Sequence, residues 1–118
     1  MSSPYSELMR LACRICTPSE LTRIKLAIAR GARGLITGKY DTSAIENAAD
    51  RIATLIEGAH IMKVREIEEE EGFNFHDRFR NLIVEAVIEM ASKTTSPYSE
   101  IFPEERVETR KRKDLEII

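Results

Sequence analysis

Residues 17–38 read TPSELTRIKLAIARGARGLITG, and this stretch contains the strongest helix signal in the chain. Thr17, Pro18 and Glu20 form a capping box with proline at the first helical position, in which the hydroxyl and the carboxylate satisfy free N–H groups reciprocally. Apolar residues then recur at spacings of three and four, which is typical of an amphipathic helix. The stretch therefore predicts a helix from Thr17 toward Gly38 with one apolar seam: Leu21, Ile24, Ile28, Gly31 and Leu35.

Two glycines interrupt this predicted helix, and each costs roughly 1 kcal/mol relative to alanine inside a helix. Either the helix breaks near residues 29–34, or Gly31 and Gly34, together with Ala27, let another backbone approach closely. We favour close packing.

Start signals of the same kind place three further helices, at residues 3–16, 43–71 and 74–96. Asp41, Thr42 and Ser43 open the middle one, with Ser43 and Glu46 as a second possible capping box, and its apolar face shifts near Gly58. No segment shows the sustained period-two alternation of a strand. The sequence therefore predicts an all-α protein, a compact antiparallel bundle of about four helices with one short N-terminal helix and three longer ones.

The domain organisation follows from the length and from the end of the chain. A chain of 118 residues is one domain, and we place the helical bundle at residues 1–103. Residues 104–118 mix both signs of charge with few apolar anchors, so we expect a charged, flexible tail that can order on a partner. The segment 96–100 is identical in sequence to residues 3–7. We interpret this repeat as the same helix-start sequence used twice, in preference to a duplicated docking peptide.

Charge is sorted along the chain. Residues 1–40 carry seven Lys or Arg against two acidic residues, whereas residues 66–90 carry eight Asp or Glu against two arginines. The candidate contacts for nucleic acid or an acidic partner are Arg23, Arg30 and Arg33 on one sector of the 17–38 helix, and Arg110, Lys111, Arg112 and Lys113 in the tail. The candidate contacts for a basic partner are Glu68, Glu69, Glu70 and Glu71.

Composition sets the predicted source and compartment. The chain has no Gln and no Trp and is rich in Ile, Glu and Arg, which favours ion-pair networks and indicates a thermophilic, archaeal source. The first residues lack the pattern of a signal peptide, and no apolar stretch approaches the length of a membrane span. We therefore expect a cytoplasmic protein that does not act on a membrane.

Motifs that could carry chemistry are few. Cys13-x-x-Cys16 has the spacing of a zinc knuckle or a dithiol site, but no second ligand pair accompanies it. We therefore interpret both thiols as small buried apolar groups, with Cys16 on the core side of the first helix and Cys13 at its edge. Glu57-x-x-His60 matches half of a di-iron helical site, and the second half is absent because Phe73 precedes His76 by three residues. We predict no catalytic, cofactor-binding or metal-binding residue, and no small-molecule ligand.

Three functions follow, in order of preference. The first is a non-enzymatic adaptor or accessory subunit that binds proteins, for example in a replication, repair or transcription assembly. The second is direct DNA or RNA binding through the basic face of the 17–38 helix, which we expect to be weak because the pI lies near 5.8. The third is a structural homo-oligomer. Ile61, Val84 and Ile88 fall outside the main apolar stripes, so we expect them at an interface with another subunit or a second copy in a homodimer.

Overall fold

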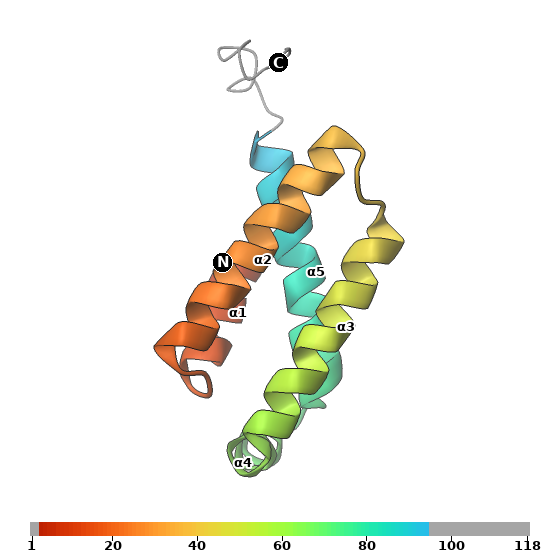
Figure 1. Ribbon diagram of the computed structural model, residues 1–118. Helices are drawn as coiled ribbons and strands as arrows, with labels where there is room; N and C mark the ends of the chain where they lie inside the picture. The colour runs from red at the N-terminus through yellow and green to blue at the C-terminus, as the bar shows by residue number, and fades with distance from the viewer. Residues whose placement is uncertain (1–2, 95–118) are drawn as a thin grey trace.

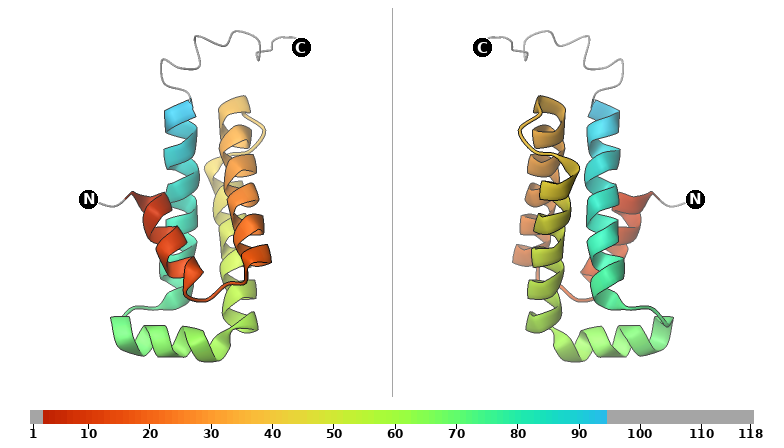
Figure 2. Two further views of the ribbon diagram at one scale, coloured as in Figure 1. Left: turned by 90° about the vertical axis from the view of Figure 1, so that its left-hand side faces the viewer. Right: turned by 90° about the vertical axis from the view of Figure 1, so that its right-hand side faces the viewer.

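The structure is a computed structural model that describes residues 3–94, and these residues form an all-α fold. Its five helices are α1 (Pro4–Cys13), α2 (Pro18–Thr37), α3 (Thr42–Ala59), α4 (Ile61–Glu71) and α5 (Phe75–Thr94). α1 and α3 run opposite to α2 and α5 (Figure 1), and Figure 2 shows α4 lying across the base of the bundle. The predicted tail, with its four basic candidates, and the repeated segment 96–100 lie outside the described residues.

α5 is the central helix, because α1, α2 and α3 all make their most extensive contacts with it. Phe75 and Phe79 near its start are fully buried, and their rings stack with centroids 4.9 Å apart. Burying an apolar side chain of this size contributes about 1.5–3 kcal/mol, so the buried sides of α5 supply much of the stability. The helices around α5 contribute the fully buried residues Leu8, Ile28, Ala49 and Val64.

The capping box at the start of α2 is confirmed. The Thr17 hydroxyl accepts a hydrogen bond from the Glu20 N–H at 3.2 Å, and the Glu20 carboxylate accepts one from the Thr17 N–H at 2.9 Å. α2 continues through both glycines without a break. A Cβ at Gly34 would lie 2.0 Å from the Tyr40 ring, and one at Gly31 would lie 3.2 Å from side-chain atoms on α3 and α5. The helix therefore does not break and the glycines are closely packed as predicted, but side chains of Tyr40, Ile45 and Val87 approach them in place of another backbone.

The predicted continuous helix over residues 43–71 is wrong, because it is divided at His60 into α3 and α4. His60 has φ −131° and ψ 42°, which lies outside the helical region. The shift of apolar face predicted near Gly58 is the physical reason. A straight helix would carry Val64 and Ile67 away from the core, whereas the corner at His60 lets both be buried. The bundle therefore has one crosswise helix at its base in place of a single long third helix.

Two predicted helix ends also differ from the structure. α1 stops at Cys13, not Cys16, and the N–H groups of Ile15 and Cys16 both bond to the Ala12 carbonyl in a tight turn. This turn still buries Ile15. α3 is capped by Asp41, whose carboxylate accepts the Ala44 N–H at 2.9 Å, and not by Ser43. An aspartate in an extended conformation just before the helix satisfies that donor, so the predicted Ser43 box does not form.

Substituting two helical glycines separates close packing from helix propensity. We expect Gly34→Ala to lower the melting temperature, because its Cβ needs the space that the Tyr40 ring occupies. Gly58→Ala should raise the free energy of unfolding by about 0.5–1 kcal/mol, because nothing lies within 4 Å of a Cβ there and alanine favours the helix. Thermal and urea unfolding measure both. Equal stabilisation by the two substitutions would contradict the packing role of Gly34.

Candidate interaction surfaces

The turn after α1 and the first turn of α2 contact the two ends of α4. Glu20 Oε1 lies 2.8 Å from His60 Nε2 at the corner where α4 begins. Arg14 pairs with Glu70 and, at 3.2 Å, with Glu71 at the opposite end of α4. The Thr17 N–H, together with His60, lowers the pKa of the Glu20 carboxyl. The three side chains Arg14, Glu20 and His60 therefore fix the crosswise helix against the rest of the bundle.

The acidic run at the end of α4 is largely engaged within the chain. Glu68 accepts the Phe75 N–H at 2.7 Å and pairs with Arg65 at 2.8 Å. The Phe75 N–H is the main cause that lowers the pKa of Glu68. Glu70 and Glu71 pair with Arg14, so the basic group expected against this helix end belongs to the chain itself. Of the four candidates, Glu69 is exposed and has no ion pair among the described residues.

The basic face of α2 is exposed. Arg23, Arg30 and Arg33 form no ion pair with any described residue, in contrast to the acidic run. Leu26 lies between them on the same face and is also exposed. This face therefore offers free guanidinium groups together with one apolar side chain.

The three predicted interface residues do not form one patch. Ile61 is 39% exposed at the base, on the first turn of α4, and Ile88 is 46% exposed on α5. Thirteen residues separate Phe75 from Ile88, so Ile88 lies roughly 20 Å along α5 from the base. Val84 is half-buried and packs against the core. Only Val84 and Ile88, one turn apart, share a helix face.

An apolar groove between α2 and α3 was not predicted from the sequence. It has a volume of about 310 Å³. Side chains of α5 form its floor, and small residues of α2 and α3 form much of its walls. It is lined by Ala27, Arg30, Gly31, Tyr40, Ala44, Ile45, Ala48, Ala49, Arg51, Ile52, Ile83 and Val87. We call it the α2–α3 groove. The alanine and glycine spacing on both helices was its sequence signal, but their pairing required the tertiary structure.

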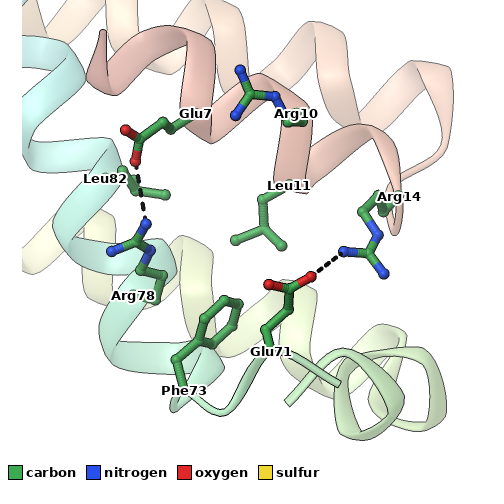
Figure 3. Close-up of a pocket in the computed structure, with 8 residues that line it drawn as sticks. All are labelled: Glu7, Arg10, Leu11, Arg14, Glu71, Phe73, Arg78 and Leu82. Carbon is green, nitrogen blue, oxygen red and sulfur yellow. Dashed lines mark hydrogen bonds and ion pairs between the residues drawn. The ribbon is translucent and has the colours of Figure 1, made fainter. Parts of the chain in front are cut away.

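A second hollow lies between α1, the end of α4 and the start of α5, and Figure 3 shows its lining. Its volume is about 340 Å³, and Leu11, Leu82 and Phe73 contribute apolar surface. Arg78 pairs with Glu7 at 3.2 Å across this hollow, and Arg14 pairs with Glu71. Because these arginines already have carboxylate partners, an anion would have to break ion pairs that link the helices. We therefore interpret the side chains that line this hollow as contacts between helices and not as a ligand-binding site.

The residues singled out for chemistry have structural partners. Glu57 pairs with Arg65 at 3.1 Å, whereas His60 bonds to Glu20, so the Glu-x-x-His pattern does not form a ligand pair. His76 Nε2 lies 3.1 Å from Asp50 and joins α5 to α3. Within residues 3–94, no group of three His, Cys, Asp or Glu side chains could hold a metal ion.

The two thiols differ from each other in burial. Cys16 is half-buried, as expected, but Cys13 is exposed, so the prediction that both are buried is wrong for Cys13. Cys13 is the last residue of α1 and lies about 100° around the helix from the buried Ala12, so it faces away from the core. Burial raises the pKa of Cys16 to about 11, with a smaller contribution from the Glu20 charge. Cys16 is therefore a neutral thiol at physiological pH and a poor nucleophile.

The chain matches no known family model, and comparison with curated proteins and solved structures likewise found no match. Among the described residues, no helix is both long and apolar enough to cross a membrane.

The Glu20 carboxylate should make stability depend on pH in the acidic range. Because folding lowers its pKa, the contribution of Glu20 is fully present above the ordinary carboxyl pKa and is lost as the pH falls through the folded value. Glu20→Gln should therefore reduce the melting temperature at neutral pH, and the difference from wild type should shrink toward low pH. Glu46→Gln, at an exposed α3 residue with no described partner, is the control and should change little at either pH.

Ile88 offers a test of self-association that spares the core. We expect the wild-type chain to sediment as a homodimer and Ile88→Lys to sediment as a monomer with an unchanged helical circular dichroism spectrum, because Ile88 is exposed. Val84→Glu should instead lower the melting temperature, since Val84 packs against the core. A wild-type chain that is monomeric throughout the micromolar range would contradict the homodimer.

Proposed function

We propose that this chain is a non-enzymatic adaptor or accessory subunit that binds a protein partner through the α2–α3 groove. The observation that carries this proposal is an uncovered apolar groove whose lining includes two arginines and no acidic residue. Small lining residues such as Ala48 would let a partner's backbone approach closely. The proposal keeps the predicted cytoplasmic location and thermophilic archaeal source.

Two further observations support an interaction role over catalysis. The titratable residues considered as possible ligands are engaged in hydrogen bonds and ion pairs that join helices: His60, His76 and Glu57. Apolar side chains next to the groove are exposed to solvent. Leu55, one turn along α3 from Ile52, is 71% exposed. An exposed leucine beside an apolar groove is typical of a surface that a partner covers.

A matched pair of α3 variants tests the adaptor. Ala48→Arg places a long charged side chain in the groove, whereas Asn47→Arg makes the same charge change on an exposed neighbour outside it. We expect the tagged wild-type chain and Asn47→Arg to recover the same discrete protein in stoichiometric amount from nuclease-treated extract of the source organism. Ala48→Arg should lose that protein while keeping its melting temperature.

The adaptor proposal fails if the two variants recover the same proteins, or if the wild-type chain recovers none. Loss of every partner on nuclease treatment would also contradict it, because a nucleic acid would then be the bridging molecule.

Direct nucleic-acid binding is the second candidate, and the exposed, unpaired arginines of α2 favour it. A phosphate backbone would meet Arg23, Arg30 and Arg33 along one helix face, and each neutralised phosphate would release counterions. The acidic residues of the chain oppose this reading. Its net charge is −2, so long-range attraction to nucleic acid is absent.

Fluorescence anisotropy with labelled duplex DNA, single-stranded DNA and RNA tests this second candidate. Binding through α2 predicts an affinity that falls steeply with salt, with a log–log slope of roughly 0.9 per phosphate neutralised on duplex DNA. Substituting Arg23, Arg30 and Arg33 together with Glu should abolish it. The same substitution at Lys25, Lys39 and Lys63 is the charge-matched control. We expect weak binding at most, and no binding near physiological salt would exclude this function.

A further inference from the structure

The shape of the α2–α3 groove suits another helix. α2 and α3 both pack on α5 and contact each other little, so Ile83 and Val87 of α5 are left at the bottom of the groove. Ala27 and Gly31 of α2 face Ala44 and Ala48 of α3 across it. Small side chains on two neighbouring helices leave room for large apolar side chains from a third helix, inserted in the manner of a helix in a hydrophobic groove.

The charges at the groove have one sign. Arg30 from α2 and Arg51 from α3 contribute to opposite walls, and neither forms an ion pair with any described residue. No Asp or Glu belongs to the lining. Elsewhere in the described residues most arginines beside a hollow are matched, as Arg78 is by Glu7 and Arg14 by Glu71. The unmatched guanidinium groups of the α2–α3 groove therefore complement a negatively charged occupant.

We propose that the partner segment is an acidic amphipathic helix. Its apolar side inserts into the α2–α3 groove, and its flanking Glu or Asp side chains pair with Arg30 and Arg51. This inference rests on the proposed adaptor function and specifies the chemistry of its partner. Apolar residues that recur every three or four positions lie on one side of the occupant helix. That side would lie along the length of the groove between Tyr40 and Ile52. Leu55 continues the apolar track beyond the groove along α3.

The occupant's charge sets orientation and selectivity more than affinity. Carboxylates on both flanks of the partner helix meet one arginine on each wall, and a basic helix with the same apolar side would place like charges together, which is unfavourable. A fatty acid could fill the apolar volume, but a single carboxylate satisfies one wall only. Duplex DNA lacks the apolar side chains that the groove floor requires.

The test uses two synthetic peptides of about 20 residues, long enough to be partly helical in water. Both carry leucine on one side at spacings of three and four, and their flanking positions are Glu in one peptide and Lys in the other. Fluorescence anisotropy with the full chain should show binding of the Glu peptide and at least about tenfold weaker binding of the Lys peptide. Dodecanoate, a small amphiphilic carboxylate, serves as competitor and should not displace the Glu peptide at equal concentration.

Charge reversal in the protein completes the test. Arg30→Glu with Arg51→Glu should weaken binding of the Glu peptide by about tenfold or more and restore binding of the Lys peptide. Lys25→Glu with Lys63→Glu makes the same net change at exposed positions of α2 and α4 outside the groove lining, and should shift the affinity by no more than about threefold, since distant exposed charges are screened. Circular dichroism melting verifies that each variant is folded.

Three outcomes overturn the inference: equal binding of both peptides, binding that the Arg30 and Arg51 reversal leaves unchanged, or displacement of the Glu peptide by dodecanoate. These outcomes are distinct from failure of the adaptor itself. If the Glu peptide fails but Ala48→Arg still abolishes capture of a protein partner, the partner chemistry is wrong and the adaptor stands. If capture also does not depend on Ala48, the adaptor function is wrong as well.

Discussion

The hydrogen bond between Glu20 and His60 fixes the corner on which the arrangement of the other helices depends. One carboxylate closes the capping box of α2 through the Thr17 N–H and also binds the imidazole at the junction of α3 and α4. α4 therefore leaves that corner across the base of the bundle, and α5 enters from its far end into the middle of the fold. With α5 in the middle, α1, α2 and α3 can each bury an apolar side against it.

Remote glutamates satisfy free N–H groups at two other helix starts. Glu68 of α4 accepts the first N–H of α5, and Glu89 of α5 accepts the Tyr5 N–H of α1 at 3.2 Å. Negative charge at a helix N-terminus interacts favourably with the helix dipole and satisfies donors that have no partner within the helix. Much of the acidic character of residues 66–90 is therefore used inside the fold. The basic residues of α2 form no ion pair with a described residue, and they lie exposed on the surface.

This asymmetry links the fold to the proposed function. Because α2 and α3 are held by α5 and by the corner at His60, they need no extensive contact with each other, and a groove stays open between them. The hollow of Figure 3 is the useful contrast, since its Arg78 pairs with Glu7 and its Arg14 pairs with Glu71, and these pairs link different helices. The same residue type therefore stabilises helix contacts in one hollow and has no ion pair with a described residue in the other.

Local signals in the sequence determined the all-α class, the N-cap of α2 at Thr17 and the N-cap of α5 at Asn74, whose side-chain oxygen accepts the Asp77 N–H at 3.0 Å. These features depend on contacts within a few residues, or on apolar periodicity along one helix, and both can be read from the order of residues. The basic face of α2 was predicted for the same reason. The corner at His60 was visible in the sequence only as a shift of apolar face.

Tertiary structure alone decided the direction of α4, the partners of the acidic run and the existence of the α2–α3 groove. Each depends on residues far apart in the chain, such as Glu20 with His60, Arg14 with Glu71, and Gly31 with Ala48 across the groove. A sequence shows that a charge or a small side chain is present, but not which distant group lies opposite it. The pairing of these groups is set by how the helices pack on α5. Only the folded chain therefore distinguishes a carboxylate that joins two helices from an arginine that has no partner among the described residues.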